Sequence, residues 1–194
     1  MIFLASTSAT RQSMLHNAGL AFTAARPDVD ERALVAANPQ WQPRETALKL
    51  AEAKAMDVSC HHAGAFIIGA DQVLSLGEKI YGKPRDRAHC REQLRELRGR
   101  THNLISAVVL ARSGKAVWSH AAEAQLTMRN YSDEFLEAYL DVIGDDCVTS
   151  VGGYKIEGRG VQLFSTVSGD HFTILGLPLL PLLEKLREAG EITS

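Results

Sequence analysis

The stretch Phe66-Ile67-Ile68-Gly69-Ala70-Asp71-Gln72 decides the fold. It opens with a compact apolar run, which is typical of a strand buried on both faces in an α/β sheet. The run stops abruptly at Asp71 and Gln72, so we expect the strand to end there and to present a carboxylate at its end. Asp71 is therefore the first candidate for a chemical role, and the alternative is that it caps the next turn.

Helix and strand patterns alternate on both sides of this run. Before it we expect a strand over 2–5, a helix from Ser8 to about Gly19 and a helix from Pro43 to about Met56. After it we expect helices over 86–97, 132–142 and 178–189, a hairpin of strands 104–111 and 115–127, and strands over 154–156 and 161–167. Without a repeat or a clear linker, this order predicts one α/β domain over residues 1–194, with a mixed central sheet flanked by helices.

The composition excludes several classes of protein. The chain is 45% hydrophobic and 23% charged, and its net charge of −2 is too small to favour nucleic-acid binding. The first residues lack the pattern of a signal peptide, and no run approaches the about 20 apolar residues of a membrane span, so we expect a cytoplasmic protein without membrane attachment. Cys60, Cys90 and Cys147 are far apart, and we expect reduced thiols.

The segment Ser6-Thr7-Ser8-Ala9-Thr10-Arg11 is a candidate phosphate site. It places hydroxyl groups and free backbone N–H groups at the start of a helix, with a guanidinium one turn further on. The alternative is that Ser8 only caps the helix and that Arg11 is a surface charge. Both interpretations stay open on this segment alone.

Carboxylates suited to a hard divalent cation occur at two places. Asp71 can hold such an ion and accept a proton from water, and the loop Asp28-Val29-Asp30-Glu31 supplies further oxygen ligands. A solvated acidic loop is the alternative, and Glu31 becomes a metal ligand only if it shares a site with Asp71. The cation expected from these ligands is Mg²⁺ or Mn²⁺.

Two lysines are candidates for neutralising phosphates. Lys54 lies on the helix after the acidic loop, and Lys83 lies in Gly82-Lys83-Pro84, where glycine and proline fix a turn. The sequence contains no H-E-x-x-H, G-x-S-x-G, Walker A or G-x-G-x-x-G motif, which argues against zinc hydrolases, serine hydrolases, P-loop enzymes and dinucleotide-dependent oxidoreductases.

Taken in order, several segments resemble the Maf family of nucleoside triphosphate pyrophosphatases. The resemblance extends from about residue 2 to residue 188 and depends on the order of the segments more than on any one of them. The segments are Leu4-Ala5-Ser6-Thr7-Ser8 with Arg11, Asp28-Val29-Asp30-Glu31, Ala51-Glu52-Ala53-Lys54-Ala55, Ile68-Gly69-Ala70-Asp71-Gln72, Gly82-Lys83-Pro84 and Gly176-Leu177-Pro178-Leu179.

The resemblance implies a Maf-type, ITPase-like fold with a cleft between two lobes. It implies a hydrolase acting on acid anhydrides, which cleaves a nucleoside triphosphate to the monophosphate and pyrophosphate with a divalent metal. Asp71 would be the catalytic proton acceptor and, with Glu31, a metal ligand, and the phosphates would be bound by Ser8, Arg11, Lys54 and Lys83. A homodimer is an expectation from the resemblance alone.

Three positions bear on the substrate. Gln72 and Glu157 resemble the branch of the family that acts on 7-methyl-GTP, whereas Thr10 fits neither this branch nor the one that acts on dTTP and UTP. A carboxylate at 157 can accept hydrogen bonds from the guanine edge, and N7 methylation adds a positive charge to the base. A dTTP/UTP-type enzyme is the alternative within the family.

Two other classes of function remain open at this point. A nucleotide-binding regulator of cell division would keep its ligand affinity and its biological effect after Asp71→Asn. A metal-dependent phosphatase or sugar-nucleotide enzyme would release orthophosphate or a sugar phosphate.

Overall fold

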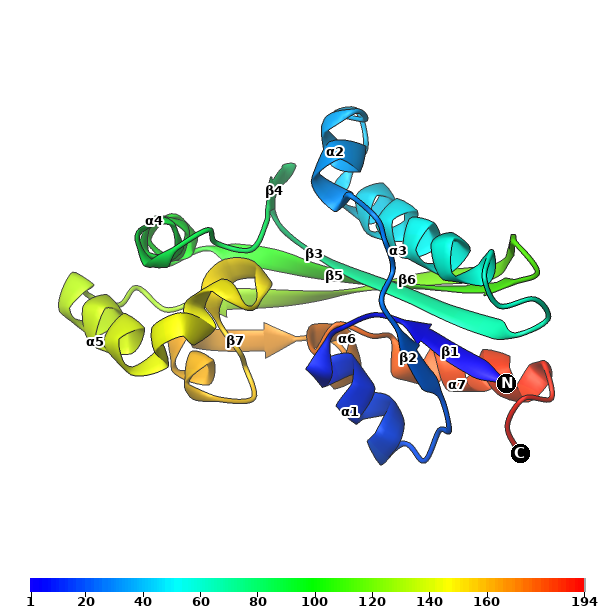
Figure 1. Ribbon diagram of the computed structural model, residues 1–194. Helices are drawn as coiled ribbons and strands as arrows, with labels where there is room; N and C mark the ends of the chain where they lie inside the picture. The colour runs from blue at the N-terminus through cyan, green and yellow to red at the C-terminus, as the bar shows by residue number, and fades with distance from the viewer. Residues whose placement is uncertain (194) are drawn as a thin grey trace. The chain divides into compact units, whose positions relative to one another are not determined.

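A computed structural model describes residues 1–193, which form two compact units (Figure 1). Unit 1 contains residues 1–72, 105–123 and those from 170 onward, and unit 2 contains residues 73–104 and 124–169. The strands follow the order β2-β1-β3-β5-β6-β7, with β4 paired to β3. Parallel and antiparallel pairs both occur, so the predicted mixed sheet of an α/β protein is confirmed. The cleft and the single-domain organisation stay predictions.

In unit 1, β1 is the strand around which the N-terminal part of the sheet forms. It pairs in parallel with β2 on one side and with β3 on the other, so that Ala5 lies opposite Gly69. The elements of unit 1 are β1 (Ile2–Ala5), α1 (Ala9–Asn17), β2 (Thr23–Ala25), α2 (Glu31–Ala36), α3 (Pro43–Ser59), β3 (Phe66–Leu76), β5 (Thr101–Arg112), β6 (Lys115–Met128), α6 (His171–Ile174) and α7 (Leu179–Glu188). Of these, β3, β5 and β6 continue into unit 2.

Helices cover both faces of the unit 1 strands. Figure 1 shows α3 on one side and α1 with α7 on the other. Side chains of β3 alternate between these layers, as strand geometry requires. Phe66, Ile68 and Ala70 face the core formed with α1 and α7, which includes the buried Leu15 and Leu182. The intervening residues therefore face α3.

The contact between α3 and β3 is unusually close at Gly69. A Cβ atom built on Gly69 would lie 2.2 Å from the Ala51 carbonyl oxygen and 2.7 Å from the Ala55 backbone nitrogen. Ala47, Ala51 and Ala55 have small side chains and are fully buried on this side of the helix. Only glycine allows the helix backbone to approach the strand this closely.

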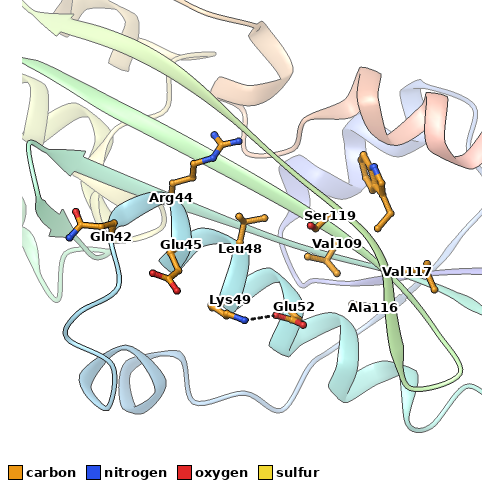
Figure 2. Close-up of a pocket in the computed structure, with 11 residues that line it drawn as sticks. Gln42, Arg44, Glu45, Leu48, Lys49, Glu52, Val109, Ala116, Val117 and Ser119 are labelled. Carbon is orange, nitrogen blue, oxygen red and sulfur yellow. Dashed lines mark hydrogen bonds and ion pairs between the residues drawn. The ribbon is translucent and has the colours of Figure 1, made fainter.

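The opposite edge of α3 borders a surface pocket of about 620 Å³, bounded by α3 and by the neighbouring part of β5 and β6 (Figure 2). Leu48, Val109 and Val117 contribute apolar walls, and the exposed pair Lys49 and Glu52 lies at the rim, with 3.2 Å between Nζ and Oε2. No predicted catalytic, metal or specificity residue lines this pocket. We therefore place the candidate site elsewhere.

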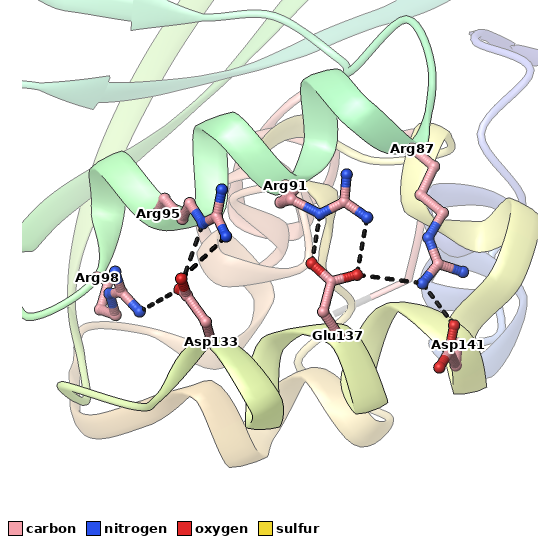
Figure 3. Close-up of polar contacts among 7 residues, drawn as sticks. All are labelled: Arg87, Arg91, Arg95, Arg98, Asp133, Glu137 and Asp141. Atoms are coloured by element: carbon pink, nitrogen blue, oxygen red, sulfur yellow. Dashed lines mark hydrogen bonds and ion pairs between the residues drawn. The ribbon is translucent and has the colours of Figure 1, made fainter.

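Unit 2 contains two helices joined by a ladder of arginine and carboxylate side chains. Figure 3 shows arginines from α4 reaching the acidic residues of α5. Arg91 and Glu137 form a bidentate pair, and Arg87 and Arg95 bind carboxylates of α5 on either side. The elements of this unit are β4 (Lys79–Tyr81), α4 (Arg87–Leu97), α5 (Asp133–Ile143), β7 (Phe164–Ser168) and 3-10 helices at Gly144–Val148, Val151–Gly153 and Arg159–Leu163.

Hydrogen bonds from the arginines also affect the ionisation of the acidic side chains. Bonds donated by Arg91 lower the pKa of Glu137, and bonds donated by Arg95 and Arg98 lower the pKa of Asp133. All of these groups are accessible to solvent, where water and salt weaken ion pairs. The ladder therefore sets how α4 and α5 lie against each other more than it adds to overall stability.

Three strand predictions are wrong. β3 does not end at Asp71 and Gln72 but continues to Leu76, because Leu74 and its neighbours pair with β4. Residues 154–156 form no strand, because the two preceding glycines adopt positive φ angles and Ser150 Oγ donates a hydrogen bond to the Tyr154 carbonyl. A 3-10 helix also precedes β7, which starts at Phe164 instead of residue 161.

The predicted helices and the predicted hairpin are confirmed to within a few residues. The short elements β2, α2, β4 and α6 were not predicted. Cys60, Cys90 and Cys147 are free thiols, as expected. Among residues 1–193, no helix has both the length and the apolar character needed to cross a membrane.

Gly69→Ala tests the close approach of α3 to β3. The added methyl group forces backbone to move, so we expect the free energy of unfolding in urea to fall by about 1–3 kcal/mol or more. Gly82→Ala is the matched control, since a Cβ there meets no atom within 4 Å. Equal unfolding midpoints for the two variants would contradict the packing described here.

Candidate active site

Asp71 lies in the interior of β3, two residues after Gly69, and is 6% exposed. Because side chains two apart on a strand point to the same face, Asp71 faces α3. Lys54 of α3 meets it there, with 2.5 Å between Nζ and Asp71 Oδ1. The tight packing at Gly69 thus brings a lysine and an aspartate together in a buried place.

Lys54 also contacts Glu31, at the first position of α2. The distance from Lys54 Nζ to Glu31 Oε1 is 2.8 Å, and the Glu31 side chain is half exposed. One ammonium group therefore binds both predicted metal ligands. Asp30 is not part of this contact, because its carboxylate caps α2 by accepting the Ala33 N–H at 2.9 Å.

Arg11 and two serines form the polar start of α1. Ser8 caps the helix and accepts the Arg11 backbone N–H at 3.4 Å, so the cap named as the alternative is present, and the phosphate role of Ser8 stays a prediction. The Arg11 side chain is not simply a surface charge, because Nε donates to the Gly176 carbonyl at 2.8 Å. Its Nη1 lies 3.5 Å from the Ser6 hydroxyl, which also accepts the Ser8 N–H at 3.1 Å.

The buried charges influence one another. Burial raises the pKa of Asp71, while Lys54 and Arg11 oppose that rise. Burial lowers the pKa of Arg11, and this effect is opposed by the charges of Asp71 and Glu31. The site thus combines two cations with two carboxylates in surroundings where each charge depends on the others.

Sequence reasoning missed part of this arrangement. Ser6 is not among the predicted site residues. A serine directly after an apolar strand and before a helix cap could have indicated it. Gln72 donates from Nε2 to Ser106 Oγ and to the carbonyls of Thr173 and Ile174, at 3.1, 3.2 and 2.9 Å. No local pattern indicates these partners, since they lie far along the chain. Thr10 lies in the first turn of α1.

The remaining predicted residues, Lys83 and Glu157, belong to unit 2 and are exposed. Gln93 donates a hydrogen bond to the Gly82 carbonyl at 3.2 Å and so steadies the turn that carries Lys83. The roles of Lys83 and Glu157 stay predictions.

The segment before Glu157 is anchored by the Tyr154 hydroxyl, which lies 2.7 Å from His102 Nε2. Burial lowers the pKa of His102 to about 4, so this imidazole is neutral at pH 7. The anchor therefore keeps its charge state across the physiological pH range.

Asp71 and Glu31 carry the oxygen ligands that a divalent cation prefers. Asp71 and Glu31 lie close enough to share one ammonium, so their hard oxygens can share one cation. Within residues 1–193, no group of three or more His, Cys, Asp or Glu residues forms a complete metal site. Magnesium usually binds through one or two carboxylates together with phosphate oxygens and water, which matches this pair.

Asp71→Asn tests the ionisation of the buried carboxyl. Because its pKa is raised on folding, the native protein loses stability as the pH rises from about 3.9 through that raised pKa. Asparagine binds no proton there. The free energy of unfolding of the variant, relative to the native protein, should therefore increase by about 1.4 kcal/mol per pH unit within that window. Urea unfolding at several pH values measures it, and a flat or falling difference would contradict the raised pKa.

This chain is similar to known proteins over most of its length. The family model described as "Maf-like protein" matches residues 1–189. A 7-methyl-GTP pyrophosphatase of Rhizobium meliloti is 50% identical and covers 100% of this chain and 98% of its own. A nucleoside triphosphate pyrophosphatase of Bradyrhizobium diazoefficiens is 51% identical, covering 96% and 92%. A solved dITP/XTP pyrophosphatase of Mycobacterium abscessus aligns over 98% and 90% of the two chains, with 13% identity and a TM-score of 0.39.

Proposed function

The chain belongs to the Maf family, and we propose on that premise that it hydrolyses a nucleoside triphosphate to the monophosphate and pyrophosphate. The contact of Lys54 with both Asp71 and Glu31 carries this proposal. A buried carboxylate can accept a proton from water, and a lysine and the Arg11 guanidinium can stabilise phosphate charge during hydrolysis of a phosphoanhydride. The printed names of relatives about 50% identical support the same reaction.

Asp71 is the proton acceptor in this proposal. The oxygen of a water molecule attacks the α-phosphorus, the bond to the bridging oxygen breaks, and pyrophosphate leaves while Asp71 takes the proton. The raised pKa of Asp71 makes its carboxylate a better base near neutral pH than an ordinary aspartate. Attack at the α-phosphorus comes from the family's reaction.

Cationic groups stabilise the negative charge of the triphosphate. In this proposal Arg11 and the N-terminal N–H groups of α1 bind phosphate oxygens, and Lys54 neutralises charge beside Asp71. The family resemblance assigns Lys83 as a second amine. Asp71 and Glu31 would hold Mg²⁺ or Mn²⁺, which supplies charge neutralisation and makes a bound water more acidic. A homodimer remains part of the proposal on family grounds, and a cytoplasmic location remains part of it on the sequence pattern.

We assign 7-methyl-GTP as the preferred substrate. Glu157 is exposed, so its carboxylate is free to accept hydrogen bonds from the N–H and amino groups of a guanine edge. The positive charge of the N7-methylated ring favours a carboxylate neighbour further. Two relatives, from Rhizobium meliloti and Brucella abortus, carry the name of this activity.

Product analysis tests the proposal. With Mg²⁺ or Mn²⁺, we expect 7-methyl-GTP to yield 7-methyl-GMP and pyrophosphate faster than GTP, UTP, dTTP or CTP react. Asp71→Asn should lower kcat by about 10²–10⁴-fold, the usual contribution of general acid–base catalysis. Glu52→Gln, which removes an exposed carboxylate of the same helix α3, is the matched control and should leave kcat unchanged.

The other outcomes separate the alternatives. Preference for UTP or dTTP would overturn only the assignment of the base. Release of orthophosphate would favour a phosphatase. Nucleotide binding without turnover, unchanged by Asp71→Asn, would favour a non-catalytic regulator.

A further inference from the structure

Lys54 is the ionic partner of both carboxylates in the candidate site. Its Nζ lies 2.5 Å from Asp71 Oδ1 and 2.8 Å from Glu31 Oε1. The side chains of Lys54 and Asp71 are each 8% exposed, so solvent screens their contact only weakly. Among residues 1–193, no other basic side chain forms an ion pair with either carboxylate. The charge of one ammonium group therefore serves two acids.

The packing of α3 places this ammonium before any ligand binds. Ala51, Lys54 and Ala55 lie three and four residues apart, which puts them on one side of the helix. The two alanines pack against Gly69 so closely that no Cβ atom fits there. Asp71 follows two residues later on the same face of β3, within reach of the buried lysine. The ion pair is thus fixed by the contact between the helix and the strand.

The formal charges of the site balance without a metal ion. Asp71 and Glu31 carry two negative charges, and Lys54 and Arg11 carry two positive ones. Both carboxylates act on the Arg11 guanidinium through their charge, although the side chain forms its hydrogen bonds with a carbonyl and a hydroxyl group. A divalent cation would therefore enter surroundings that are already neutral.

A divalent cation and the Lys54 ammonium need the same oxygens. Asp71 and Glu31 are the predicted metal ligands, and residues 1–193 contain no group of three or more His, Cys, Asp or Glu that could hold a metal ion. Like charges a few ångströms apart repel strongly in a buried place, and more so when one of them is divalent. The two carboxylates cannot bind such a cation at full strength while Lys54 holds them.

We propose that Lys54 is a built-in competitor of the divalent cation, which holds Asp71 and Glu31 in the nucleotide-free protein and keeps its affinity for the cation low. Phosphate oxygens offer the ammonium other acceptors, so the competition is relieved when a triphosphate binds. The inference deepens the proposed function and rests on it for the identity of the metal ligands and of the phosphate. It agrees with the usual binding of Mg²⁺ through one or two carboxylates together with phosphates.

Mn²⁺ alone, without nucleotide, is the probe for this competition. Its free concentration is read from the electron paramagnetic resonance signal, so no activity is needed. Lys54→Met keeps an unbranched side chain and removes the charge, and we expect its Kd for Mn²⁺ to be about tenfold lower than that of the native protein, or lower still. Lys49→Met is the matched control, because it removes an exposed lysine of α3 that is paired with Glu52. It should bind Mn²⁺ as the native protein does.

Two further variants locate the ion and guard against a loss of structure. Glu31→Gln added to Lys54→Met should abolish the gain, because the half-exposed carboxylate is one of the two expected ligands. Lys54→Gln is a second neutral variant, whose amide can still donate hydrogen bonds to the carboxylates, and it should show a gain of the same direction. Urea unfolding checks that each variant is folded.

A non-hydrolysable α,β-methylene analogue of GTP tests the relief by phosphate. Added at the same concentration to both proteins, it binds Mn²⁺ in solution equally, so the comparison between the proteins is unaffected. The advantage of Lys54→Met over the native protein should shrink, because phosphate then draws the ammonium away from the carboxylates. An undiminished advantage would overturn the relief by phosphate.

Equal or weaker Mn²⁺ binding by both neutral variants, or a gain that survives Glu31→Gln, would overturn the competition. The binding assay is independent of the reaction. A gain in Mn²⁺ affinity without turnover of any nucleotide would mean that the proposed reaction fails while the competition stands. Turnover without such a gain would mean the reverse.

Discussion

The close approach of α3 to β3 at Gly69 is the constraint on which the site depends. Because no side chain separates the helix backbone from the strand, Lys54 reaches Asp71 inside the protein. Burying a lone carboxylate is costly, and a buried ion pair repays that cost only with good geometry. The small residues around Gly69 thus serve the chemistry as well as the packing.

The same arrangement places two cations, Lys54 and Arg11, near two carboxylates, Asp71 and Glu31. Lys54 is shared with the half-exposed Glu31, and the direct hydrogen-bond partners of Arg11 are neutral, a carbonyl and a hydroxyl group. Cations with neutral or shared partners can take up phosphate charge without breaking a fully matched pair.

Local patterns predicted much of the fold, and long-range contacts account for what was missed. The helix over 86–97 and the cap at Ser8 follow from periodicity and from local hydrogen bonding, which a sequence displays directly. The continuation of β3 beyond Asp71 depends on pairing with β4, and the turn at residues 152–154 depends on glycine conformations and buried contacts.

The residues of the site also fall into two groups, those that the sequence indicates and those whose contacts depend on the fold. Asp71, Lys54, Glu31 and Arg11 were selected from their residue types and from the family resemblance, and the structure brings them together. The partners of Gln72 lie 34 to 102 positions away in the sequence, so no spacing rule could indicate them. Side-chain hydrogen bonds to distant main-chain carbonyls become visible only once the fold is known.

The pH dependence of kcat/KM for the native protein and for Lys54→Met tests the central claim most directly. Ionisation of the substrate is common to both proteins, so the difference between their profiles comes from the groups beside Lys54, of which Asp71 is the buried carboxyl. We predict that the acid limb of the native protein reports a pKa above the ordinary value of an aspartate, about 3.9, and that it moves to higher pH without the lysine. An acid limb at the ordinary value, or one that does not move, would contradict the account.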